Sequence, residues 1–164
     1  MGTIQDVQRI LQKGGLQPGK HRELQIAIVE FFGLHFTPDS TVLYLGDVGN
    51  KSVIYEKEML EELGVPVTAH GKLPDIILYD EAKNLLFLIE AVTSHGPIRP
   101  GRLFELERLL KNCIPKRTYI SAFFEFAEYG RYMLPIAWDT HVWMAEIPEH
   151  MIHFNGDRYM GQHG

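Results

Sequence analysis

The sequence predicts a single α/β domain in which a central mixed β-sheet is flanked by helices on both faces. Its 164 residues are about the length of one domain. Strand-like segments alternate with helical ones along the chain, which is typical of a sheet covered by helices. Two strand segments, 76–79 and 85–89, are apolar at every position, so both of their faces must be covered.

Composition excludes several classes of protein. Hydrophobic residues make up 45% of the chain and charged residues 23%, a balance that is typical of a soluble globular protein and excludes a disordered or fibrous one. No stretch approaches the roughly 20 apolar residues of a membrane span. The N-terminus lacks the apolar core of a secretory signal. A single cysteine, Cys113, excludes a disulfide framework and favours a reducing, cytoplasmic location.

The first elements predict a boundary near residue 19. Residues 1–19 contain a short helical pattern and then a glycine- and proline-rich cluster at 14–19, so we expect a linker or the end of a preceding domain. The main domain is expected over 20–164. It begins with an amphipathic helix over Lys20–Phe32, which Gly33 closes.

The later elements are bounded by turn-forming residues and assigned from the period of their apolar positions. In chain order we expect a turn at 37–40, a strand at 42–45, a glycine-rich loop at 46–50, a helix at 51–63, strands at 75–80 and 85–92, a helix at 103–112, a strand at 117–122, a helix at 124–137 kinked near Pro135, and strands at 141–145 and 151–154.

Two acids meet at the end of one predicted hairpin. Asp75 begins one strand, Glu90 lies near the end of the next, and the polar residues 81–84 form a loop of a common hairpin length. Pairing from this loop places Asp75 directly opposite Glu90, with Cβ atoms about 4.5–5.5 Å apart. Two carboxylates this close repel each other and resist burial unless a cation neutralises them.

The ligand type indicates which cation this would be. Oxygen ligands without a paired cysteine or histidine favour a hard ion such as Mg²⁺. Such an ion can polarise a phosphodiester oxygen and help to generate a hydroxide nucleophile, as in metal-dependent nucleases. Two solvated acids at an exposed strand end, or a register shifted by one residue, would explain the same spacing without a function.

Charge is unevenly distributed. The formal net charge is −5, yet six basic residues and only two acids lie between Arg99 and Arg117. A basic stripe on an acidic body is compatible with a nucleic-acid partner. A solvated helix face would have the same composition.

Several motifs resemble a known family. Pro74-Asp75, a hydrophobic strand and then Glu90-Ala91-Val92 resemble the PD-(D/E)XK nuclease core, with valine where lysine is usual. The surrounding sequence resembles the BsuBI/PstI family of type II restriction endonucleases. The stretches that carry this resemblance are Leu43–Asp47, His70–Asp75, Leu88–Pro97 and Ile152–Gly156.

The resemblance runs from about Pro18 to the C-terminus and corresponds to the family's C-terminal catalytic domain. It implies that Asp75 and Glu90 bind Mg²⁺, and that a homodimer cleaves double-stranded DNA at a short palindrome, typically CTGCAG. It also implies a cognate DNA methyltransferase in the same system. A separate N-terminal DNA-recognition domain usual in the family is absent from this chain, which we take as either a fragment or a stand-alone relative.

The positive charge of the core is left unassigned by Val92. A residue two places after Glu90 lies on the same strand face, so a lysine there would lie beside the metal. We expect Lys72, three residues before the first acid, to act instead as a catalytic residue that orients water or stabilises the transition state. Lys51 and Arg102 are the alternatives.

Other residues are candidates for supporting roles. Glu23 on the first helix and Asp47 in the glycine-rich loop are candidate additional acids, although a solvated glutamate and an Asx-turn would explain them without a function. Candidate DNA contacts are hydroxyl, imidazole and cationic groups. They are Lys51, Ser94, His95, Arg99 and Arg102.

Two competing interpretations remain open. A nuclease-like domain that has lost its chemistry would serve as a DNA-binding or assembly module, and its DNA binding would survive Asp75→Asn. A globular domain with an accidental acid pair would show no Mg²⁺-dependent thermal shift.

Overall fold

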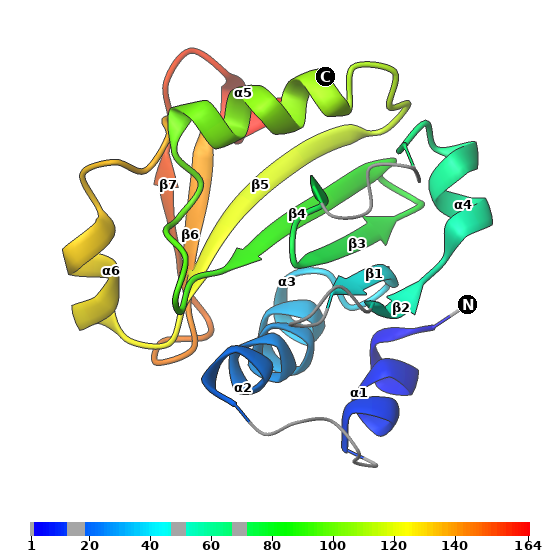
Figure 1. The fold of residues 1–164 in the computed structure, drawn as a ribbon, viewed down its shortest axis with the longest axis horizontal. Coiled ribbons are helices and arrows are strands. Elements are labelled where there is room, and N and C mark those ends of the chain that lie inside the picture. The colour runs from blue at the N-terminus through cyan, green and yellow to red at the C-terminus, as the bar shows by residue number, and fades with distance from the viewer. Residues whose placement is uncertain (1, 13–18, 47–51, 67–71) are drawn as a thin grey trace.

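A mixed β-sheet of eight strands forms the centre of the described chain, which in this computed structural model comprises residues 2–12, 19–46, 52–66 and 72–164 (Figure 1). The strand order is β2-β1-β3-β4-β5-β6-β7, with β8 paired to β5. The pairs β4–β5 and β5–β6 are parallel, and the others are antiparallel. The strands are β1 (Thr41–Gly46), β2 (Ser52–Tyr55), β3 (Ile76–Asp80), β4 (Leu85–Ala91), β5 (Lys116–Phe123), β6 (Thr140–Met144), β7 (Met151–Phe154) and β8 (Gln162–His163).

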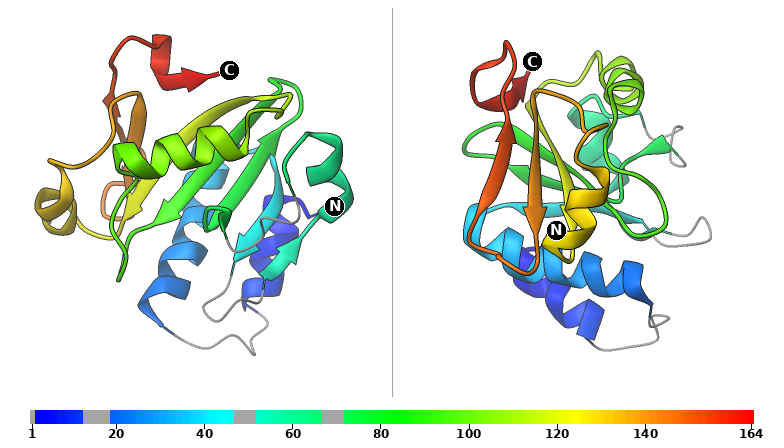
Figure 2. Two further views of the ribbon diagram at one scale, coloured as in Figure 1. Left: turned by 45° about the horizontal axis from the view of Figure 1, so that its top comes forward. Right: turned by 90° about the vertical axis from the view of Figure 1, so that its left-hand side faces the viewer.

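Helices cover both faces of this sheet, as the sequence predicts (Figures 1 and 2). One face carries α1 (Ile4–Gln12), α2 (Lys20–Ala27), a π-helix (Ile28–Gly33) and α3 (Leu34–Phe36). The opposite face carries α4 (Lys57–Glu62), α5 (Pro100–Leu109) and α6 (Phe126–Tyr132). A short 3-10 helix, Tyr159–Gly161, precedes β8. Among the described residues, no helix is long and apolar enough to cross a membrane.

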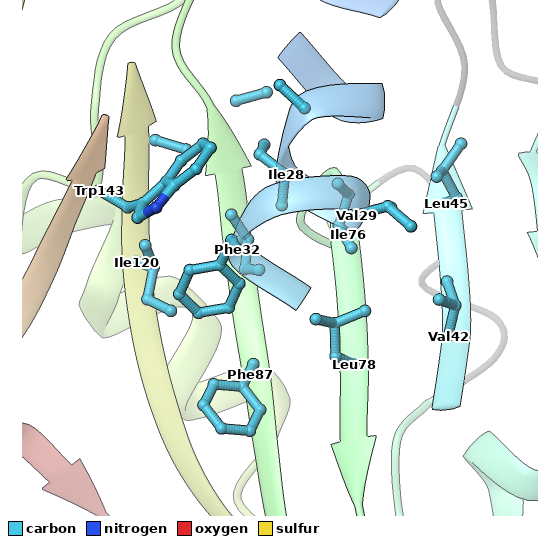
Figure 3. Close-up of a cluster of buried hydrophobic side chains, with 14 of the residues drawn as sticks. Ile28, Val29, Phe32, Val42, Leu45, Ile76, Leu78, Phe87, Ile120 and Trp143 are labelled. Carbon is cyan, nitrogen blue, oxygen red and sulfur yellow. The ribbon is translucent and has the colours of Figure 1, made fainter. Parts of the chain in front are cut away.

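Alternate residues of the central strands fill two separate cores. On the α2 face, Phe32 of the π-helix packs against Phe87 of β4 and against Trp143 of β6, with ring centroids 6.0 Å apart in each of these two pairs (Figure 3). The neighbouring Leu86 and Leu88 point to the α5 face. This alternation follows from the two-residue period of a strand and explains why the central segments are apolar throughout.

The β3–β4 hairpin has the predicted register. Ile76 pairs with Ile89 and Asp80 with Leu85, and residues 81–84 form the turn. Asn84 closes this turn with a φ of 49°, a left-handed conformation that asparagine tolerates well. Continuing this register by one residue places Asp75 opposite Glu90.

The N-terminal helix differs from the expectation that residues 1–19 form a linker or the end of another domain. Ile4 and Val7 are fully buried in the core on the α2 face, and Thr3 forms a β-bridge with Thr41. Ile4 lies so close to Gly33 that a Cβ on this glycine would come within 2.9 Å of the isoleucine side chain. The described part of this segment therefore belongs to the domain.

Four predicted helices have different bounds, and the one expected over 103–112 is α5, which begins and ends three residues earlier. The first does not close at Gly33 but continues through the π-helix to Phe36. The helix expected over 51–63 begins only at Lys57, because Val53-Ile54-Tyr55 has the β-branched and aromatic character of a strand and pairs with β1. The helix expected over 124–137 ends at Tyr132, before Pro135.

A buried polar network fixes α5 to the sheet and to the C-terminus. The carboxylate of Glu107 accepts hydrogen bonds from Arg117 Nε at 2.6 Å and from the Tyr119 hydroxyl at 2.6 Å, and His163 Nδ1 lies 3.3 Å away. Burial acts to raise the pKa of Glu107, but the bonds from His163, Arg117 and Tyr119 hold this pKa well below its usual range. The orientation of α5 over the sheet is thereby fixed.

Candidate active site

Asp75 and Glu90 lie together at one end of the β3–β4 hairpin. Asp75 immediately precedes β3, and Glu90 is the penultimate residue of β4. Because side chains alternate along a strand, Glu90 shares the α5 face with Leu86 and Leu88. The two acids therefore meet at the point where the sheet passes under the N-terminal end of α5.

The carboxylate of Glu90 is mostly buried and is hydrogen-bonded to Arg102. Arg102, in the first turn of α5, donates from Nε and Nη2 to Oε1 of Glu90 at 2.9 and 2.8 Å. Burial and the negative charge of Asp75 raise the pKa of Glu90 to about 7, and Arg102 acts in the opposite direction. Asp75 and Glu90 therefore repel each other, as the hairpin register predicts.

Asp75 is held by the backbone of the neighbouring strand and by an imidazole. Its Oδ2 accepts a hydrogen bond from the Ala91 amide at 2.8 Å, and its Oδ1 lies 3.4 Å from His21 Nε2. The other ring nitrogen of His21 lies 3.0 Å from the hydroxyl of Thr93. The hydrogen bond to Asp75 raises the pKa of His21, and burial opposes this shift.

The first helix brings His21, and not Glu23, to the acids. Gln25, one helical turn after His21, is fully buried and donates to the carbonyl of Gly46 at 2.7 Å. Glu23 is exposed and lines a separate groove with Lys20 and Glu146. We expected this helix to bring an additional acid to the site, but the residue that it brings there is His21. The spacing of polar residues at 21 and 25 within a buried helix was the signal that could have identified it.

The position of the usual lysine is part of a hydrophobic core. Val92 is buried beneath α6 with Phe123 and Tyr129. Lys72, the basic residue expected to compensate, is exposed and lines a groove along α5 with Phe104 and Arg108. Two basic side chains contact the acid pair, Arg102 at Glu90 and His21 at Asp75.

The segment after β4 is exposed beside the acids. Ser94 Oγ lies 3.0 Å from His95 Nδ1, and the guanidinium of Arg99 lies over Gly96, immediately before α5. These side chains are accessible to a partner. Asp47 and Lys51 lie outside the described residues.

The acid pair suits a hard divalent ion. Among the described residues there is no group of three or more His, Cys, Asp and Glu side chains arranged around a metal. The carboxylates of Asp75 and Glu90 nevertheless suffice for Mg²⁺, because this ion retains several of its waters and needs only one or two carboxylate ligands. The raised pKa of Glu90 indicates that a second negative charge at this place is unfavourable without a cation.

The fold is shared with a solved nuclease. The SdaI restriction endonuclease matches with a TM-score of 0.81 and 35% identity, over 88% of this chain and 46% of that one. The chain thus has the fold of a restriction endonuclease, with an acid pair at the end of its central hairpin.

Sequence comparison gives the family. The model of the BsuBI/PstI restriction endonuclease domain matches residues 7–157, and the chain belongs to this family. It is 42% identical to the type II restriction enzyme BsuBI of Bacillus subtilis over 146 residues, and this match covers 89% of this chain and 46% of BsuBI. It is 33% identical over 153 residues to the type II restriction enzyme AplI of Arthrospira platensis, covering 88% and 47%. The chain spans about half the length of these relatives.

Proposed function

We propose that this chain is the catalytic domain of a Mg²⁺-dependent type II restriction endonuclease. The observation that carries the proposal is the proximity of Asp75 to Glu90, whose pKa is raised by burial and then by the charge of Asp75. A divalent cation would neutralise both groups. Membership of the family adds the class of reaction, which is hydrolysis of phosphodiester bonds in double-stranded DNA.

Asp75 and Glu90 would hold the ion. When bound, Mg²⁺ would supply Lewis-acid stabilisation of the phosphoryl oxygen under attack. The amide of Ala91 fixes Oδ2 of Asp75, so the direction of this carboxylate is set before any ligand binds. His21 would hold a proton at Nε2, which faces Oδ1 of Asp75. Attack in line with the scissile bond would leave 5′-phosphates.

The DNA backbone would pass over the exposed side chains around the N-terminal end of α5. Ser94, His95 and Arg99 offer hydroxyl, imidazole and guanidinium donors to phosphate oxygens. A groove of about 450 Å³ along α5 extends this surface. It contains three cationic side chains, those of Lys72, Arg108 and Lys111. We assign Lys72 to phosphate binding in this groove, because it is exposed there and has no contact with the acids.

The partners of this domain are proposed from its membership of the family. Cutting both strands of a palindrome, typically CTGCAG, needs a twofold dimer. A separate recognition domain and a cognate DNA methyltransferase would complete the system, which would act in the cytoplasm. The net charge of −5 is compatible with DNA binding if the basic surface near α5 alone contacts the duplex.

The proposal is tested by incubating the chain with a plasmid that carries CTGCAG sites, in the presence of Mg²⁺ or Mn²⁺ and in the presence of EDTA. We expect metal-dependent cleavage that Asp75→Ala abolishes and that Asp157→Ala, an exposed control, does not change. Cleavage that is indifferent to Asp75→Ala would overturn the site. DNA binding by a wild type that never cuts would instead identify a binding module.

A further inference from the structure

The active site needs a positive charge that its usual position does not supply. Val92 lies on the same strand face as Glu90 but is 1% exposed and enclosed by Phe123, Tyr129 and Val142. A lysine side chain there would have to leave this apolar cluster to reach a phosphate. The cation must therefore come from another element.

Arg102 already lies at the acid pair. Its guanidinium contacts Oε1 of Glu90 through two nitrogens, at 2.9 and 2.8 Å. The third nitrogen, Nη1, donates to Oε1 of Glu105 at 2.8 Å. The side chain is 26% exposed, so it lines the site and remains open to solvent on one side.

The element that carries Arg102 makes this position well defined. Pro100 begins α5 and presets its first turn, and Glu105 lies three residues after Arg102 on the same helix face. Glu107, farther along α5, fixes the helix to Arg117 of β5. An arginine on a rigid helix loses little freedom when it binds an anion, and its planar donors suit phosphate oxygens.

We infer that Arg102 supplies the positive charge that lysine supplies in related cores, and that Glu105 is a positioning residue for it. This inference rests on the proposed function. If Glu90 bound a divalent cation, its carboxylate would be shared between that ion and Arg102, so Nε and Nη2 of Arg102 would become available to another anion. These donors would then stabilise the negative charge that develops on the phosphoryl oxygens during hydrolysis, while Nη1 would keep its hydrogen bond to Glu105.

The test separates this role from simple support of Glu90. Single-turnover cleavage of a plasmid with CTGCAG sites is compared for wild type, Arg102→Met, Arg102→Lys and the exposed α6 control Arg131→Met. DNA affinity is measured with Ca²⁺ in place of Mg²⁺, and Mn²⁺ affinity is measured by titration calorimetry without DNA. Thermal melting shows that each variant is folded.

We expect Arg102→Met to lower the cleavage rate by roughly 100-fold or more, the cost of removing one preorganised donor. The Mn²⁺ affinity should be retained or increased, because a repelling cation has been removed from the site. DNA affinity should change little. Arg102→Lys should recover part of the rate. Glu105→Ala should lower the rate by about tenfold, although DNA affinity should be retained or increased, because Glu105 lines the proposed DNA groove.

Other outcomes are equally informative. A loss of Mn²⁺ binding in parallel with activity would show that Arg102 only holds Glu90 in place, and would overturn the inference. Unchanged cleavage by Arg102→Met would overturn it as well. If wild type and Asp75→Ala are both inert with every metal, the proposed function itself fails.

Discussion

The carboxylate of Asp75 accepts a hydrogen bond from the amide of Ala91 at 2.8 Å, so the strand that carries Glu90 also orients the opposing acid. Asp75→Asn keeps an acceptor oxygen for this bond and removes the negative charge. Burial is the main cause of the raised pKa of Glu90, and the charge of Asp75 raises it further, so the substitution should lower this pKa part of the way toward its ordinary value. Carbon-13 NMR titration of the Glu90 carboxyl would measure the change. An unaltered titration would mean that the two acids do not interact.

Glu90→Gln should stabilise the metal-free protein at alkaline pH. The pKa of Glu90 is about 7 in the fold and near 4.5 when unfolded, so its ionisation favours unfolding and the penalty grows as pH rises from 4.5 to 7. We expect a gain in the free energy of unfolding on the order of 2 to 3 kcal/mol at pH 8 that disappears near pH 4.5. Denaturant unfolding at both pH values checks this. Addition of Mg²⁺ should raise the melting temperature of wild type alone.

His21→Ala should weaken the site without unfolding the protein. His21 contacts Asp75 from α2 and is anchored through Thr93, so its loss frees the orientation of a proposed metal ligand. Outer-shell partners of this kind are worth about 10–100-fold in metal affinity or activity. Mn²⁺ titration and single-turnover cleavage would be compared with the exposed control His150→Ala. Equal values for the two variants would exclude a role for His21.

Glu107→Gln should destabilise the fold. Arg117 is 8% exposed, and Glu107 is the carboxylate that balances its charge. Leaving a buried guanidinium uncompensated costs about 3 kcal/mol or more in the free energy of unfolding. Urea unfolding, with the exposed Glu62→Gln as control, measures this difference. A difference under about 0.5 kcal/mol, the range of ordinary surface substitutions, would show that water compensates the charge.

Acid should destabilise the protein through a histidine on β6. Burial and the neighbouring His153 lower the pKa of His141 to about 4, and the two Nδ1 atoms lie 2.6 Å apart. Because an unfolded histidine titrates near 6.5, stability is full above that pH and falls as pH decreases toward 4. The loss due to His141 is on the order of 3 kcal/mol. Wild type should therefore lose more stability than His141→Gln over this pH interval, as followed by urea unfolding. Equal losses of stability in the two proteins would show that a group other than His141 takes up the proton on unfolding.

The hairpin was predictable because its determinants are local. Loop length sets the register, and the apolar runs on either side of residues 81–84 leave only one pairing that buries both strands. The acid pair followed directly from that register. The two-sided cover of the sheet followed from the same apolar runs.

Other features depend on contacts between distant segments. The burial of Ile4 against Gly33 cannot be read from either segment alone. Strand β2 was missed because a short β-branched run merged with the helical pattern that follows it. The pairing of Arg102 with Glu90 and of His21 with Asp75 depends on how two helices cross the sheet, which residue spacing does not determine.

Anionic and cationic halves of the site have different origins in the chain. Both acids belong to one continuous hairpin, whereas the cations project from α2 and α5, on opposite sides of the sheet. We therefore expect that a substitution can move the cation to another element without disturbing the proposed metal-binding acids. Transplanting residues 75–90 into a relative should transfer both carboxylates together, and under the proposed mechanism the cleavage rate should then depend on the basic side chains of the recipient.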